Sequence, residues 1–301
     1  DWVWIKSRSS SEHPVVTDSV RGANYQLYPN QTAAQSNYSG RVTAFNSDGF
    51  SIGGDNEVNQ SSQTYVSWNW LAGGSASSNT DGSITSTVSA NTTSGFSIVK
   101  FTGTGANATV GHGLGSAPSM IIIKGLSYAD HWPLYHSSLG NNKKLRFNLT
   151  GAEISGSTNW NDTSPTSSVF SIGTNSEINY NGGTHIAYCF ADVKGYSKVG
   201  GSYVGNGSSD GTYVHLGFKP AWLVVKRSSA SGDNWIMWDN KRNPFNVTEN
   251  KLEANDSGAE AINAGSNKVD FLSNGFKMRK TSAGNNASGS TYIYMAFAEA
   301  P

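Results

Sequence analysis

Apolar and polar residues alternate along most of this chain with a period of two. Segment 65–70 places Trp68 and Trp70 on the same face, with polar residues between them. Segments 121–123 and 223–225 are instead continuous aliphatic runs, as expected for central strands covered on both faces. Asp-Gly and Asn-Gly pairs, which favour tight turns, separate these segments. The pattern predicts many short strands and an all-β fold.

Helical periodicity is weak throughout the chain. Residues 249–262 are the best candidate, but Asn255, Asp256 and Gly258 interrupt the apolar pattern. We expect a single helical turn in this segment. Short strands joined by polar turns favour β-sandwiches of the jelly-roll or concanavalin-like type over βαβ units. We therefore predict tandem β-sandwich domains with almost no helix.

Three kinds of strand-like segment recur in the same order along the chain. Each set has an opening run that ends in lysine, a middle segment led by phenylalanine and an aromatic closing segment. The opening runs are 2–6, 120–124 and 222–226; the middle segments are 50–53, 170–173 and 276–278; the closing segments are 65–70, 185–190 and 292–297. Fixed-order repetition of this kind is typical of an array of similar modules.

The spacing of the opening runs indicates the size of each module. Their final lysines are Lys6, Lys124 and Lys226, and intervals of this length match independent domains. We predict three modules, at residues 1–73, 74–193 and 194–301. A Gly/Ser-rich linker forms the first boundary. The first module lacks the strands that precede the lysine run in the other two, so we expect residues outside this sequence to complete it.

Charge and composition argue against two classes of partner. Lys plus Arg and Asp plus Glu each total 21, so the net charge is zero, without the basic excess of a nucleic-acid binder. No polybasic stretch suggests an anionic membrane, and no apolar run approaches the roughly 18 residues that span one. We expect neither a nucleic-acid nor a membrane partner. Because no net charge opposes association, we expect a homo-oligomer.

The recurring lysines Lys6, Lys124 and Lys226 allow two interpretations. Each lysine is either a ligand-binding cation or a charge at the end of a strand, whose stem covers the sheet while its ammonium reaches solvent. Recurrence in every module favours the second interpretation, because equivalent framework positions serve the fold.

A calcium site is the main alternative to a turn in the first module. Asp48, Asp55, Asn56 and Glu57 place several oxygen atoms within ten residues. Ca²⁺ requires six to eight oxygen ligands, and this set lacks the regular spacing of an EF-hand loop. The six histidines likewise lack metal-ligand spacing. We therefore predict a hairpin turn, with no metal and no cofactor.

Candidate catalytic groups are sparse. The single cysteine, Cys189, lies in an alternating strand, where we expect a small buried residue. His185 is on the same strand but too distant to activate the thiol. No repeated carboxylate pair of the kind that glycosidases require is present. We predict no catalytic residues and no enzymatic activity.

Trp160 is the best candidate for a ligand-binding residue. Polar loop residues flank it, and it has no counterpart in the other modules. Exposed tryptophans stack on sugar faces, so we expect Trp160 to contact a ligand at the surface. Trp132 and Trp235 each follow an opening run and are expected in the core instead.

Several runs together resemble a known family. They are Trp2 to Arg8, Asp18 to Gly22, Ala44 to Phe50, Tyr65 to Trp70 and the longer stretch Gly95 to Lys124. The chain resembles the repeated concanavalin-like or tail-fibre-type domain of unknown function in marine bacteriophage and cyanophage virion proteins. The third module departs from the family pattern, because residues 239–242 replace the run that begins at Asp18. The resemblance transfers no catalytic or ligand-binding residue.

The resemblance implies a structural protein of a phage virion, located on an extracellular appendage such as a tail or head fibre. Its expected partners are other virion proteins and a glycan of the host cell surface. Weak sites repeated along the chain raise avidity without any single strong site. Two alternatives remain open: a lectin-like bacterial adhesin that binds glycans, and a polysaccharide depolymerase, which the lack of paired acids disfavours.

Overall fold

The computed structural model describes residues 1–262 and 265–300. Antiparallel strands dominate this part of the chain, and its two helices are single turns. The prediction of an all-β, sandwich-like fold with almost no helix is therefore confirmed. Neither of the described helices is long and apolar enough to cross a membrane.

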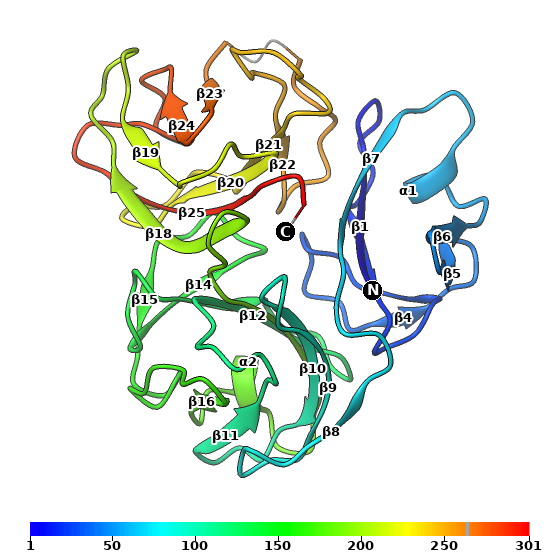
Figure 1. Ribbon diagram of the computed structural model, residues 1–301. Helices are drawn as coiled ribbons and strands as arrows, with labels where there is room; N and C mark the ends of the chain where they lie inside the picture. The colour runs from blue at the N-terminus through cyan, green and yellow to red at the C-terminus, as the bar shows by residue number, and fades with distance from the viewer. Residues whose placement is uncertain (263–264, 301) are drawn as a thin grey trace.

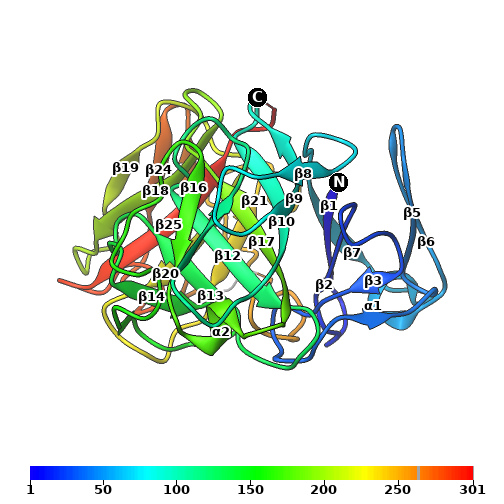
Figure 2. The same cartoon turned by 90° about the horizontal axis from the view of Figure 1, so that it is seen from below.

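The first predicted module contains a main sheet with strand order β2-β1-β7 and two ribbons, β3-β4 and β5-β6. Its elements are β1 (Trp2–Ser7), β2 (Val15–Asp18), β3 (Tyr25–Gln26), β4 (Ser36–Asn37), β5 (Val42–Asn46), β6 (Gly49–Ile52), α1 (Asn56–Asn59) and β7 (Tyr65–Trp70). The ribbon β5-β6 stands at the outer side of the molecule, away from β1 and β7 (Figure 2).

The second predicted module contains an eight-stranded sheet, in the order β15-β14-β13-β12-β17-β10-β9-β8, and the ribbon β11-β16. Its elements are β8 (Ser77–Asn79), β9 (Ser86–Asn91), β10 (Phe96–Thr102), β11 (Ala108–Gly111), β12 (Met120–Gly125), β13 (Pro133–His136), β14 (Lys143–Arg146), β15 (Ile154–Ser155), β16 (Val169–Ile172), α2 (Ser176–Asn179) and β17 (Thr184–Phe190).

The third predicted module contains a main sheet in the order β18-β25-β20-β21-β22 and a smaller sheet, β19-β24-β23. Its elements are β18 (Ser197–Val204), β19 (Tyr213–His215), β20 (Trp222–Arg227), β21 (Ile236–Asp239), β22 (Leu252–Glu253), β23 (Val269–Leu272), β24 (Gly275–Met278) and β25 (Thr291–Phe297).

The recurring segments occupy corresponding places in three separate sheets. In each main sheet the opening strand (β1, β12 or β20) lies between the strand that follows it and the closing strand (β7, β17 or β25). The registers also correspond, with pairs Trp4↔Trp68, Ile122↔Tyr188 and Val224↔Met295. We call residues in equivalent pairs corresponding residues. The division into modules, with boundaries near residues 73 and 193, remains a prediction; first, second and third module denote residues 1–73, 74–193 and 194–301.

The main sheets of the three modules pack around a common centre instead of forming a string (Figure 1). One apolar cluster, the shared core, draws buried residues from all three modules. The Trp4 ring, for example, lies 5.6 Å from the Trp68 ring, 5.8 Å from the Phe147 ring and 6.5 Å from the Trp222 ring, measured between centroids. Each module also has an outer core between its main sheet and its smaller sheet or ribbon.

The predicted helical turn at residues 249–262 is wrong. That segment forms β22 and turns, consistent with its interrupting Asn, Asp and Gly residues. The helical turns occur instead at α1 and α2. They begin after Asp55 and Asn175, whose side chains accept hydrogen bonds from the backbone N–H of Glu57 and Glu177.

Candidate functional site

The recurring lysines are fully buried, which contradicts the expectation that their ammonium groups reach solvent. Lys6, Lys124 and Lys226 each have 0% exposure. Each ammonium donates to a backbone carbonyl of another module: Lys6 to Asp256 (2.7 Å), Lys124 to Thr32 (3.0 Å) and Lys226 to Thr150 (3.2 Å). The expectation failed because a loop from the adjacent module covers each strand end.

These lysine contacts join the three modules in a cycle. The first module reaches the third, the second reaches the first, and the third reaches the second. Backbone hydrogen bonds follow the same route: Glu260 N to Arg8 O (2.8 Å), Asp130 N to Thr32 O (2.9 Å) and Gly232 N to Thr150 O (3.0 Å). Head-to-tail contacts of this kind close into a ring when the rotation permits it.

Burial changes the acidity of these lysines in the same way. Desolvation lowers the pKa of each lysine to about 8, while nearby carboxylates oppose the shift. For Lys124 the opposing carboxylate is Asp130, whose backbone oxygen also accepts from the ammonium at 2.9 Å. An amine with a pKa near neutrality can act as a base, but these amines are enclosed by backbone carbonyls and packed strands.

A second set of corresponding residues reaches across the same boundaries at the ends of β2, β13 and β21. The Asp18 carboxylate accepts from the Tyr188 hydroxyl at 2.8 Å, and the Asp239 carboxylate accepts from the Trp68 indole N–H at 3.1 Å. His136 takes the corresponding place in the second module. Burial lowers the pKa of His136 to about 4, so its ring is neutral at ordinary pH.

Asp18 and Asp239 are each neutralised by an arginine three residues later. Asp18 bonds to the Arg21 Nε at 2.5 Å, and Asp239 bonds to the Arg242 Nε at 2.6 Å. The second pair lies within residues 239–242, the run that departs from the family pattern by sequence. The Asp-x-x-Arg spacing common to both modules is the signal in the sequence that could have identified these pairs.

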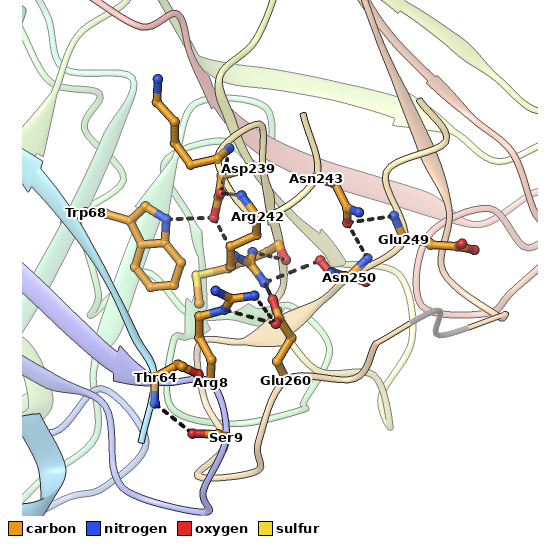
Figure 3. Close-up of polar contacts among 12 residues, drawn as sticks. Arg8, Ser9, Thr64, Trp68, Asp239, Arg242, Asn243, Glu249, Asn250 and Glu260 are labelled. Atoms are coloured by element: carbon orange, nitrogen blue, oxygen red, sulfur yellow. Dashed lines mark hydrogen bonds and ion pairs between the residues drawn. The ribbon is translucent and has the colours of Figure 1, made fainter. Parts of the chain in front are cut away.

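The boundary between the first and third modules contains a buried network of charges (Figure 3). Glu260 accepts from Arg242 Nη1 at 2.7 Å and from Arg8 Nη2 at 2.8 Å. Arg242 also binds Asp239, and its guanidinium lies 5.8 Å from the centre of the Trp68 ring. The side chains of Glu260 and Arg242 are only 1% and 2% exposed. Two arginines and two carboxylates balance the charge within this network.

Two carboxylates of the proposed calcium site, those of Asp55 and Glu57, bind Arg41 instead. Arg41 Nε donates to Asp55 at 3.0 Å, and the Arg41 guanidinium lies 2.7 Å from Glu57. Desolvation raises the pKa of Glu57 to about 7 against the opposing effect of Arg41. Asp48 lies in the turn between β5 and β6, as predicted. Across residues 1–262 and 265–300, no group of three or more His, Cys, Asp or Glu side chains is arranged to hold a metal ion.

Trp160 is buried at 1% exposure, so the expectation that it presents a free surface for a ligand is wrong. Its indole N–H donates to the Lys143 carbonyl at 2.8 Å, and Tyr135 packs against its ring at 5.5 Å between centroids. The polar residues around it were misleading, because Asn159 beside it is also buried. Trp132 and Trp235 are buried, which confirms their predicted place in the core.

Cys189 is fully buried in β17, as predicted for a structural residue. Burial raises the pKa of its thiol, which disfavours a nucleophilic thiolate. His185 does not serve it, because the Nε2 of His185 lies 2.6 Å from the Tyr128 hydroxyl. The arrangement stabilises a neutral thiol in an apolar core.

A groove with aromatic walls runs along β7, between the first and third modules. It encloses about 210 Å³, and its lining includes Trp68, Trp70, Trp222 and Phe297. Asp239, which accepts from the Trp68 indole, lies at its edge. An apolar groove with a few polar groups is a general feature of binding sites. The alternation of residues 65–70 places Trp68 and Trp70 on one face, but this local pattern does not predict that the face lines a groove.

These features define an all-β, sandwich-like protein whose recurring charged residues join its sheets around a shared core. The chain belongs to the family described as Domain of unknown function (DUF7483), which matches residues 1–301. No curated protein and no solved structure matches the chain.

Proposed function

We propose that the protein is a non-enzymatic structural component of a bacteriophage virion, within a tail fibre, head fibre or similar appendage. There it contacts the host surface or other virion proteins. The observation that carries this proposal is that the recurring lysines bind backbone carbonyls of neighbouring modules. We call these contacts between modules joints. Residues that recur along the chain and form contacts between its modules indicate a structural role more directly than a catalytic one.

The charged groups in the joints support this proposal. The ammonium groups of Lys6, Lys124 and Lys226 bind backbone carbonyls, and Arg242 and Glu260 bind each other. Buried charges held in this way fix relative positions, because breaking one contact leaves an uncompensated charge. A fixed arrangement of three modules is suited to presenting surfaces to large partners.

Composition and sequence resemblance favour a virion over other settings. The runs Trp2 to Arg8 and Gly95 to Lys124 resemble phage virion domains, and the zero net charge does not oppose assembly of copies. Assembled copies would raise avidity for a host glycan without one strong site.

The proposal is tested by locating the protein in purified phage particles. We expect mass spectrometry to detect it in intact virions and antibody-gold labelling to place it on an appendage. Detection only in the envelope of uninfected bacteria would contradict the proposal. Release of reducing sugar from host polysaccharide by the purified protein would contradict its non-enzymatic part.

The aromatic groove favours a second candidate, a lectin-like bacterial adhesin. Trp70 and Trp222 line an open apolar groove, and aromatic faces of this kind bind sugars by stacking. Glycan-array binding that is lost in Trp70→Ala and retained in the matched variant Trp160→Phe, whose ring is buried, would support this candidate. Array binding together with absence from virions would favour the adhesin over the phage protein.

A further inference from the structure

Within the described residues, the main sheet of the first module ends at its closing strand, β7. In the second module β17 lies between β12 and β10, and in the third β25 lies between β20 and β18. β7 pairs with β1 on one side, and within residues 1–262 and 265–300 no strand takes the corresponding place on its other side. Unpaired backbone groups along an edge are a template for another strand.

The hydrogen-bond phase of β7 identifies the backbone groups that face this edge. Arg8 N donates to Thr64 O at 2.8 Å, just beyond the end of the β1–β7 ladder. Because bonded and non-bonded pairs alternate in antiparallel ladders, Ser67 directs its N–H and C=O away from β1, as do the residues two positions before and after it. The corresponding residue in the second module, Ala187, pairs with Val99 of β10.

The inner face of this open edge is the aromatic groove. In the second and third modules the corresponding space is filled by apolar side chains of β10 and β18: Phe96, Ile98 and Val199, all in the shared core. In the first module the walls at this place are Trp68 and Trp70 of β7 and Trp222 of β20, with about 210 Å³ between them. β7 borders the centre of the molecule, near the C-terminus (Figure 1).

The far wall of the groove corresponds to a surface that already binds a strand elsewhere. Ser137 N donates to Ser119 O at 2.8 Å, and Asn240 N donates to Ala221 O at 2.9 Å, so the two pairs occupy corresponding positions. Ser119 and Ser137 lie directly against Gly200 of β18, where an added Cβ would be 2.7 Å and 2.5 Å from their side chains. Ala221 and Asn240 line the groove instead.

The outer ribbon of the first module is incomplete in the same way. β16 pairs with β11, and β24 pairs with β19, whereas β6 pairs only with β5 in the part of the chain that the structure describes. Phe170 of β16 and Phe276 of β24 are buried at 1% and 0% exposure, but Phe50 of β6 is only half-buried. A cleft of about 450 Å³ lies beside Phe50 and Leu71, and Leu71 is 68% exposed.

We propose that the first module binds a two-stranded polypeptide segment. One strand of the segment pairs with β7, as β10 pairs with β17 and β18 with β25, and the other pairs with β6, as β11 pairs with β16 and β19 with β24. Its first strand carries apolar residues at alternate positions, and those on the inner face enter the groove beside Trp222. The corresponding strands of residues 1–301 are already paired, so the occupant is a segment outside these residues, not a second copy of the chain. This is recognition by strand addition: main-chain hydrogen bonds supply affinity, and pockets for alternate side chains supply specificity.

The chain itself supplies a probe for this site, the synthetic peptide of residues 94–112, which contains β10 and β11. We expect calorimetry to give one peptide per chain, and the fluorescence of the groove tryptophans to change on binding. N-methylation of Val99 removes the N–H that bonds to the closing strand and should weaken binding at least about tenfold. N-methylation of Ile98 is the matched control: its N–H points away from that strand, so affinity should stay within about twofold.

A substitution in β7 itself tests whether the peptide pairs with this edge. Ser67→Pro removes an N–H that faces the open edge, and proline is tolerated where that group has no ladder partner. We expect Ser67→Pro to weaken peptide binding at least about tenfold, while Ser67→Ala keeps the N–H and the affinity. Circular dichroism checks the fold of both variants, and the N-methylated peptides give an answer that does not depend on any variant folding.

Each remaining outcome decides against the proposal. Absence of peptide binding up to the solubility limit overturns it, as does equal binding of the two N-methylated peptides. Dimers of the unmodified chain that dissociate in Ser67→Pro would identify a second copy as the occupant. A glycan that binds the groove equally well in Ser67→Pro, with no peptide binding, would assign the site to the adhesin function instead. Localisation in virions is a separate measurement, so either proposal can fail alone.

Discussion

The first and second modules have main sheets with the same central order but different surroundings. β17 is paired on both sides, whereas β7 has one described partner. The outer core of the second module contains sixteen buried apolar residues among those described, and the outer core of the first contains five. A module can therefore keep its central strands with little outer core of its own, provided that its inner face is well packed. The first module depends more on the shared core than the second does.

The first prediction tests whether the first module depends more on the shared core than on its own outer core. Trp4→Ala should lower the free energy of unfolding by about 3–5 kcal/mol, because it removes a buried ring in contact with all three modules. Val42→Ala, in the outer core of the first module, should cost less, about 2 kcal/mol. Urea unfolding measures both values.

Phe245, 82% exposed, gives the control, since Phe245→Ala should change stability by less than about 0.5 kcal/mol. Trp4→Phe retains part of the contact and keeps the comparison measurable if Trp4→Ala does not fold. A larger loss for Val42→Ala than for Trp4→Ala would contradict dependence on the shared core.

The second prediction concerns the network that holds the first module to the third. Glu260→Gln should destabilise the protein by about 3 kcal/mol, because it leaves the buried Arg242 and its neighbour Arg8 without a compensating carboxylate. In the matched control, Glu153→Gln breaks a more exposed pair with Lys143 and should cost less than about 1 kcal/mol. Chemical denaturation measures both. Equal losses would show that burial of the network has no energetic consequence.

The third prediction concerns the buried lysines, whose lowered pKa should affect stability equally in all three modules. The folded-state pKa of Lys6 is about 8, below its ordinary value of 10.5. The unfolded chain therefore binds more protons between these values, and the lysine's contribution makes stability rise as pH increases from 8 toward 10. The slope should be at most about 1.4 kcal/mol per pH unit for each lysine.

Denaturation at a series of pH values measures this slope. Lys6→Met should reduce it by about as much as Lys124→Met or Lys226→Met, since all three lysines have similar pKa values. Lys241→Met, at an exposed position, should leave it unchanged. An unchanged slope in all three buried-lysine variants would contradict the lowered pKa values.

The strands could be predicted from the sequence because their pattern is local. Alternation in 65–70 and the aliphatic run at 121–123 identified β7 and β12 without any tertiary information. The helical turns were missed, although Asp55 and Asn175 are capping residues, because a single turn has too few positions to show a helical period.

The joints could not be predicted because their partners are distant in sequence. The lysines contact carbonyls 250, 92 and 76 residues away, and backbone carbonyls leave no mark in side-chain pattern. Trp160 illustrates the converse error. Its flanking residues are polar, yet its indole N–H donates to the Lys143 carbonyl and its ring packs against Tyr135. Local polarity therefore did not indicate exposure.

Peptide-resolved hydrogen exchange on the chain of residues 1–301 tests the contrast between the modules most directly. In the closing strands β17 and β25, both sets of alternating amides are paired, whereas in β7 the set that includes Ser67 faces the open edge. We expect residues 65–70 to exchange faster than residues 184–190 and 291–297, and residues 49–52 to exchange faster than 169–172. Equal protection of the three closing strands would contradict the open edge at β7, and with it the incomplete sheet of the first module.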